Sequence, residues 1–193
     1  MIKVKIKSQV REWMESIIIA VILALIIRAF VVQAFKIPSG SMIPTFQVGD
    51  RIFVNKFLYG ARIPFTDIRF PALRQPIRGD IIVFRSPEDK KKDFVKRLIA
   101  TEGETVEIRD GKIYIDNKAI DEPASIKGVY YYNNGDFGGE SQVIKVPAGS
   151  YYALGDNSSS SRDSRYWGFV PKKNLIGKVI VIYWPIYRMK AVK

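Results

Sequence analysis

The sequence TVEIRDGKIYID at residues 105–116 decides the fold class, because it has the pattern of a β-hairpin. Asp110-Gly111 is a two-residue turn of the kind that joins antiparallel strands. Pairing across this turn aligns two apolar pairs on one face: Ile108 with Ile113, and Val106 with Ile115. Strand register and burial therefore agree, and the hairpin predicts an antiparallel sheet with one buried face.

Short segments of the same kind recur beyond residue 35. They are rich in β-branched and aromatic residues and are bounded by Gly, Pro, Asn and Asp. The predicted strands are residues 51–57, 80–84, 94–100, 105–109, 112–115, 142–146, 151–154 and 177–184. We therefore expect a mostly β fold of antiparallel sheets, in which residues from about 101 to 142 form a small inserted β subdomain.

The apolar segment at residues 16–35 predicts a single transmembrane helix. As a helix its 20 residues span about 30 Å, the thickness of a bilayer core. Arg28 costs roughly 2.5–3.5 kcal/mol at a helix centre, which the surrounding Ile, Leu and Val residues offset. A cleaved signal peptide ending at Val32-Gln33-Ala34 and a buried core helix are the alternatives. The apolar length and two preceding glutamates favour an uncleaved anchor.

Basic residues before the apolar segment predict its orientation. They are Lys3, Lys5, Lys7 and Arg11. By the positive-inside rule, residues 1–15 form a short cytoplasmic tail and residues 16–35 anchor the chain in the cytoplasmic membrane. Residues 36–193 then form a β domain on the outer, periplasmic or extracellular, face.

The composition excludes several kinds of site. The 193-residue chain has no histidine and no cysteine, which rules out a Ser-His-Asp triad, a thiolate nucleophile and a zinc site built on these residues. A hydrolase of this composition must use Lys, Asp, Glu or a terminal amine as its base. The net charge of +12 is typical of contact with nucleic acid or phospholipid. The predicted topology favours phospholipid and no nucleic acid.

The sequence PSGSMIPT at residues 38–45 is the first candidate for chemistry. Two serines separated by Gly40 and flanked by prolines form a rigid, exposed turn that can present one hydroxyl as a nucleophile. The other hydroxyl and a backbone N–H can then face an oxyanion. An ordinary linker leaving a membrane helix is the alternative.

Lys96, in FVKRLIA at residues 94–100, is the candidate base. Strand alternation places it on the same face as Phe94 and Leu98. An apolar face lowers the pKa of a lysine from about 10.4, and a general base must be neutral near the working pH. A solvated strand lysine is the alternative.

The sequence GDNSSSSRDSRYWGFVP at residues 155–171 is the third candidate. Its hydroxyls, carboxylates, amide and guanidiniums suit a buried polar network that orients a catalytic group. The run of four serines is equally typical of a flexible loop, whereas Tyr166, Trp167 and Phe169 favour order.

Together these stretches resemble the type I signal peptidases, a family of membrane-bound serine proteases. The resemblance is carried by PSGSMIPT, by GDRIFVNK at residues 49–56, by RGDIIVF at 78–84 with FVKRLIA, and by residues 155–171. All four blocks occur in the family's order. The resemblance implies an enzyme that cleaves signal peptides from exported preproteins after small residues, with no metal and no cofactor.

Carried over by position, the resemblance implies that Ser41 is the nucleophile and Lys96 the general base. Ser39 would donate to the oxyanion, together with the Ser41 backbone N–H. The implied partners are the signal peptides of preproteins and the phospholipid membrane.

Five further residues are implied as supports of the site. Ser161 would hydrogen-bond the base lysine, and Asp163 would brace the site with Arg165. Asp156 would pair with Arg97. Many relatives have Gly-Leu-Pro-Gly-Asp where this chain has ATEGE at residues 100–104, and Arg-Asp-Asn where it has three serines at residues 158–160.

Two other functions remain open at this point. A self-cleaving repressor also uses a Ser/Lys pair, but it carries a DNA-binding domain in place of the membrane span. A non-catalytic, membrane-tethered β module would bind extracytoplasmic peptides and would not depend on Ser41 or Lys96.

Four aromatic residues suit either the core or the membrane interface: Phe57, Tyr59, Phe65 and Phe70.

Overall fold

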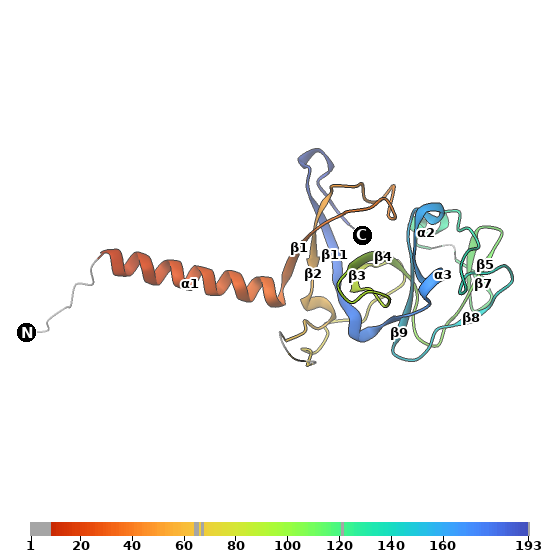
Figure 1. Ribbon diagram of the computed structural model, residues 1–193, viewed down its shortest axis with the longest axis horizontal. Helices are drawn as coiled ribbons and strands as arrows, with labels where there is room; N and C mark the ends of the chain where they lie inside the picture. Colours follow the sequence, from red (N-terminus) through yellow and green to blue (C-terminus); the bar gives the residue numbers. More distant parts are fainter. Residues whose placement is uncertain (1–8, 64–65, 67, 121, 193) are drawn as a thin grey trace, which may run out of the picture.

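The computed structural model describes residues 9–63, 66, 68–120 and 122–192. A long helix, α1 (Gln9–Phe30), projects from a body built of β-strands (Figure 1). The helix buries none of its residues against the body, and it is the single helix in this part of the chain long and apolar enough to cross a membrane. The predicted cations Lys3, Lys5 and Lys7 lie outside the described residues.

The structure corrects the extent of the predicted membrane helix. The helix begins before residue 16 and ends at Phe30, and strand β1 (Val32–Lys36) follows it. β1 pairs antiparallel with β2 (Arg51–Asn55), from Val32 opposite Asn55 to Lys36 opposite Arg51. The β-branched and alternating sequence after Phe30 therefore bonds to a partner strand instead of continuing the helix.

The larger sheet has eight strands in the order β1-β2-β11-β3-β4-β9-β10, with β12 paired to β11. The remaining strands of this sheet are β3 (Ile81–Arg85), β4 (Asp93–Ala100), β9 (Ser150–Leu154), β10 (Val170–Pro171), β11 (Leu175–Trp184) and β12 (Lys190–Ala191). All its pairings are antiparallel, which confirms the predicted fold class.

A second sheet has four strands in the order β7-β6-β5-β8 and lies at the far end from α1 (Figure 1). Its strands are β5 (Thr105–Arg109), β6 (Lys112–Ile115), β7 (Lys118–Ala119) and β8 (Ile144–Lys145). The predicted register is confirmed, since Ile108 faces Ile113 and Val106 faces Ile115. The chain enters this sheet from β4 and returns to β9, which is adjacent to β4 in the larger sheet.

Short helices fill the connections. They are η1 (Phe57–Tyr59), α2 (Ala124–Lys127), η2 (Ser158–Ser160), α3 (Ser164–Trp167), η3 (Lys172–Asn174) and η4 (Ile186–Arg188). Tyr59 is a core residue, not an interface residue, because it is buried and its hydroxyl donates to Asp80 at 2.6 Å. Phe57 and Phe70 are exposed, and Phe65 lies outside the described residues.

Candidate active site

The turn that carries Ser39 and Ser41 follows β1 directly. The N–H of Ile37 donates to Asp50 O at 2.8 Å, and the N–H of Gly49 donates to Ile37 O at 2.9 Å. These two hydrogen bonds join the two ends of the loop formed by residues 38–48. Met42 and Phe46 are buried in the core beneath the turn. The apolar residues of the segment therefore anchor it, and the two serines remain at the surface.

Ser41 and Lys96 meet although they are far apart in the sequence. Lys96 Nζ lies 2.7 Å from Ser41 Oγ and donates a hydrogen bond to it. Lys96 belongs to β4, where it is paired with Ile82 of β3, and only 3% of it is exposed. Its nitrogen lies 5.9 Å from the centre of the Phe94 ring.

Burial lowers the pKa of Lys96 to about 8. The carboxylate of Asp163 opposes this effect and raises the pKa, whereas the nearby Arg165 lowers it further. Removing an ammonium from water costs free energy that distant charges recover only in part. The lysine is thus close to the protonation state that a base needs at neutral to mildly alkaline pH.

Asp156 and Arg97 form a buried ion pair behind the dyad. Arg97 donates to Asp156 from Nε at 2.8 Å and from Nη2 at 2.6 Å, and Nη1 donates to Gly79 O at 2.9 Å. The hydroxyl of Thr45 donates to the same carboxylate. The pair therefore connects β4, which carries Lys96, to the segment that carries Ser41.

Asp163 and Arg165 form a second ion pair that is completely buried. Arg165 donates to the two carboxylate oxygens at 2.8 and 2.9 Å, and the N–H of Gly155 donates to Asp163 at 2.9 Å. Arg165 also donates to Ser158 Oγ at 2.8 Å. The serine-rich segment is thus an ordered network and not a flexible loop.

The structure corrects the expected role of Ser161. Its hydroxyl is buried, but among the described residues it has no hydrogen-bond partner, Lys96 included. The hydroxyl lies against Gly155 instead: a Cβ on that glycine would be 2.1 Å from Ser161 Oγ and 2.5 Å from Ser41 O. Lys96 is held instead by its hydrogen bond to Ser41 and by burial.

Two contributors to the site were not assigned from the sequence. Asn157 donates from its backbone N–H to Ser41 O and from Nδ2 to Gly40 O, both at 3.0 Å. Thr45 bonds to Asp156, as described above. Both residues lie inside the motifs that were singled out, but the motifs alone do not show which atoms contact the turn that carries Ser41.

A groove of about 460 Å³ runs beside the dyad. Its polar lining includes Ser39, Ser41 and Ser160, and its apolar walls are Phe35, Ile37, Met42, Val83, Phe94 and Val95. The N–H of Ser41 donates to no described residue, so it is available to a ligand. Within the described ranges, no cluster of acidic residues could hold a metal ion.

Two strand edges border this groove. β1 pairs with β2 on one side and ends the sheet order on the other. β9 pairs with β4 only from Arg97 onward, so residues 93–96 have one edge free of sheet partners in the described structure. An extended peptide in the groove can therefore form backbone hydrogen bonds to either edge.

Comparison with known proteins gives consistent matches. A sequence model of the family described as signal peptidase, peptidase S26, matches residues 10–184. A signal peptidase I of Leptolyngbya laminosa is 38% identical and covers 96% of this chain and 85% of its own. A signal peptidase I of Bacillus licheniformis is 35% identical, and the match covers 95% of this chain and 94% of the relative. A signal peptidase I of Pseudomonas aeruginosa is 33% identical, and the match covers 92% of this chain and 74% of the relative.

Among solved structures, a signal peptidase I from Enterococcus faecalis V583 is similar to part of the chain. It is 37% identical, with a TM-score of 0.43, and the match covers 54% of this chain and 97% of that one.

Proposed function

This chain belongs to the peptidase S26 family of signal peptidases, and we propose that it cleaves signal peptides with Ser41 as nucleophile and Lys96 as general base. Membership of the family makes it a membrane-bound serine endopeptidase. The observation that carries the residue assignment is the 2.7 Å contact between Lys96 Nζ and Ser41 Oγ. The lowered pKa of Lys96, about 8, supports it.

In the proposed mechanism, neutral Lys96 accepts the proton of Ser41 as Oγ attacks the carbonyl carbon of the scissile bond. The oxyanion accepts hydrogen bonds from the Ser41 N–H and the Ser39 hydroxyl, each worth about 2.7–4 kcal/mol. The ammonium of Lys96 then protonates the leaving amine, and an acyl-enzyme forms. Lys96 next activates a water molecule, which releases the acyl group and restores Ser41.

The proposed substrate is an extended segment of a preprotein with small residues next to the cleaved bond. It would pair with the free edges of β1 and β4, between which the groove lies. The walls of the groove are mostly apolar, which suits uncharged side chains next to the cleaved bond. Arg97, Asp156, Asp163 and Arg165 are then positioning residues behind the dyad.

We further propose that α1 crosses the cytoplasmic membrane with its N-terminus inside and the β body on the outer face. α1 carries Arg11 and Glu12 near its start and is apolar from Ile17 to Ile27. The turn with Ser41 follows β1, which itself follows the end of α1. The dyad would therefore be near the membrane surface, where the apolar part of a signal peptide ends.

The test is cleavage of a purified preprotein by the full-length protein in detergent. Wild type should cut after a small residue, as read from the N-terminus of the product, and Ser41→Ala and Lys96→Met should each lose this activity. Ser125→Ala and Lys118→Met are matched controls, because both side chains are exposed and neither lines the groove. Persistent cleavage by Ser41→Ala would refute the assigned nucleophile. No cleavage by wild type would favour a peptide-binding module.

A further inference from the structure

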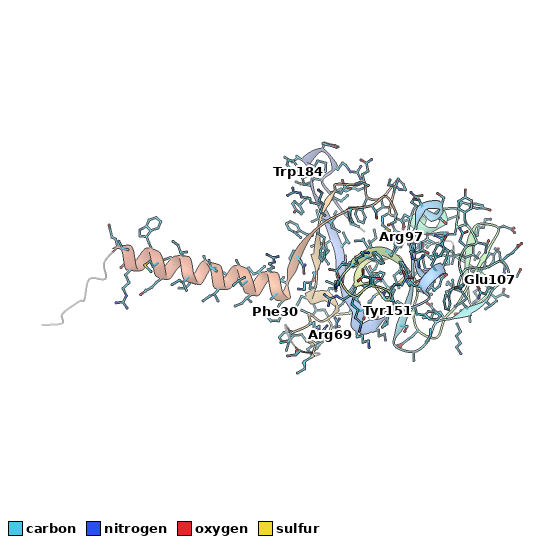
Figure 2. The ribbon with its side chains drawn as sticks, viewed as in Figure 1. Phe30, Arg69, Arg97, Glu107, Tyr151 and Trp184 are labelled. Atoms are coloured by element: carbon cyan, nitrogen blue, oxygen red, sulfur yellow. The ribbon has the colours of Figure 1, made fainter. Side chains whose placement is uncertain are left out.

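A second cavity, of about 450 Å³, lies where α1 joins the β body. Its lining includes Ala29 of α1, Gln33 of β1 and residues of the body such as Lys56, Arg69 and Lys173. Phe30 at the end of α1 packs edge-on against Phe70, with 5.6 Å between the ring centres. Figure 2 shows Phe30 and Arg69 close together at this junction.

The cavity is strongly basic. Its lining includes five basic side chains: Lys56, Arg62, Arg69, Arg85 and Lys173. Asp93 is the one acidic residue among the described lining residues, and it lies 3.8 Å from Arg85. Lys56, Arg69 and Lys173 therefore add positive charge that no described carboxylate of the lining compensates.

The basic side chains are held in place by the fold. Arg69 donates to the carbonyl oxygens of Gly60 and Lys173 at 3.1 and 2.9 Å, and also to that of Leu175. Lys56 Nζ lies 3.4 Å from the carbonyl oxygen of Arg28, in the last turn of α1. These acceptors are neutral, so they fix the cations without compensating their charge.

Burial and neighbouring cations both disfavour the charged forms of two side chains in the cavity. Burial, followed by the charge of Arg28, lowers the pKa of Lys56. Burial, followed by the charge of Arg62, lowers the pKa of Arg69. An anion bound between these groups would favour their charged forms.

We propose that this cavity binds the phosphate of an anionic phospholipid headgroup. With α1 in the bilayer, the cavity lies at the depth of the headgroups, because Ala29 in the last turn of the helix forms part of its wall. Lysine and arginine are the common protein ligands of phosphate. The aromatic pair Phe30 and Phe70 and the nearby Ile63 offer apolar surface to the glycerol and acyl portion.

The experiment measures lipid bound to the full-length protein in detergent by native mass spectrometry, with phosphatidylglycerol, phosphatidylcholine or inorganic phosphate as the probe. Phosphatidylglycerol should bind with at least fivefold preference over phosphatidylcholine. Lys56→Gln/Lys173→Gln should weaken its binding by about 25-fold, since each cation near an anionic lipid contributes about fivefold. Lys56→Arg/Lys173→Arg keeps the charge and should retain binding.

The matched control is Lys118→Gln/Lys145→Gln, which removes the same charge from exposed positions on β7 and β8. It should bind phosphatidylglycerol like wild type. An equal loss in the control would mean that net charge alone attracts the lipid, and equal binding of the two lipids would also overturn the proposal. Displacement of the lipid by millimolar inorganic phosphate would identify a site for free anions. The readout is binding, so none of these outcomes depends on cleavage by Ser41.

Discussion

The carbonyl oxygen of Ser41 accepts a hydrogen bond from the N–H of Asn157 at 3.0 Å. The side-chain amide of Asn157 donates a second hydrogen bond, to Gly40 O at 3.0 Å. The backbone of the turn that carries Ser41 is thus hydrogen-bonded to the serine-rich segment. The distance between Ser41 and Lys96 therefore depends on these two hydrogen bonds as well as on strand β4, which carries the lysine.

Asn157→Ala removes the bond to Gly40 and leaves the backbone bond to Ser41. We expect kcat to fall roughly tenfold with a smaller change in KM, because a hydrogen bond of about 1–1.5 kcal/mol holds the attacking group in register. Steady-state kinetics on a preprotein measures the effect. Gln142→Ala is the control, since its amide donates to Asp136 O at 2.9 Å, outside the candidate site. An unchanged kcat in Asn157→Ala would contradict the positioning role.

Gly155→Ala tests the close packing behind the nucleophile. The new methyl would meet Ser161 Oγ at 2.1 Å and Ser41 O at 2.5 Å, so the Ser41 turn must move. We expect a loss of activity of a hundredfold or about 3 kcal/mol, typical of a displaced catalytic group. Gly128→Ala is the matched control, because its nearest contact would be an ordinary 3.4 Å. Equal activity of the two variants would show that the turn tolerates displacement.

The pH dependence of activity follows from the pKa of Lys96, about 8. Below this pH the lysine is mostly an ammonium and cannot accept the proton of Ser41. We expect kcat/KM to rise about tenfold between pH 7 and pH 9, as the neutral fraction grows from about one tenth to nearly one. A profile that is flat across this range would contradict Lys96 as the base.

Lys96→Met tests the cost of burying the base. Both folded and unfolded chains are protonated at Lys96 below about pH 8, so there the folded state bears the full penalty of the buried ammonium. Between about pH 8 and 10.5 the folded state loses its proton first, and this penalty decreases as pH rises. We therefore expect the methionine variant to be more stable by about 1–3 kcal/mol at pH 7 and inactive. Urea unfolding of both proteins at pH 7 and pH 10 should show the gain shrinking. A less stable variant at pH 7 would contradict this account.

Breaking the Arg97–Asp156 pair should destabilise the fold. Arg97→Met leaves the Asp156 carboxylate buried without its main partner, which costs about 3–5 kcal/mol. The double variant Arg97→Met/Asp156→Leu should recover part of this loss, because no buried charge then remains. Thermal unfolding of the singles and the double measures the coupling. Additive losses would show that the two residues act independently.

Much of the fold could be predicted because local patterns and burial agree in it. The hairpin around Asp110-Gly111 has one register that buries its apolar face, and the structure adopts that register. The end of α1 could not be predicted in this way, since residues 17–35 are apolar except for Arg28 and Gln33 and no polar segment marks the end of the helix. Its strand conformation depends on pairing with β2, which is a tertiary contact.

In the candidate site, too, some features could be predicted from the sequence and others depend on tertiary contacts. Motif order singled out Ser41 and Lys96, and the fold brings them within 2.7 Å. Motif order also suggested a bond from Ser161 to the lysine, but the structure places that hydroxyl against Gly155. Arg165 donates to Ser158 Oγ and to Ser161 O inside the buried network, and spacing in the sequence does not contain such contacts.

The direct passage from α1 into β1 has a consequence for substrate choice. Only Val31 separates the helix from the strand, and β1 is bonded along its length to β2, so the body has no flexible stalk. With α1 embedded in lipid as proposed, Ser41 would be held at a constant height above the bilayer. This geometry predicts that cleavage depends on the distance between the end of a preprotein's apolar segment and the bond to be cut.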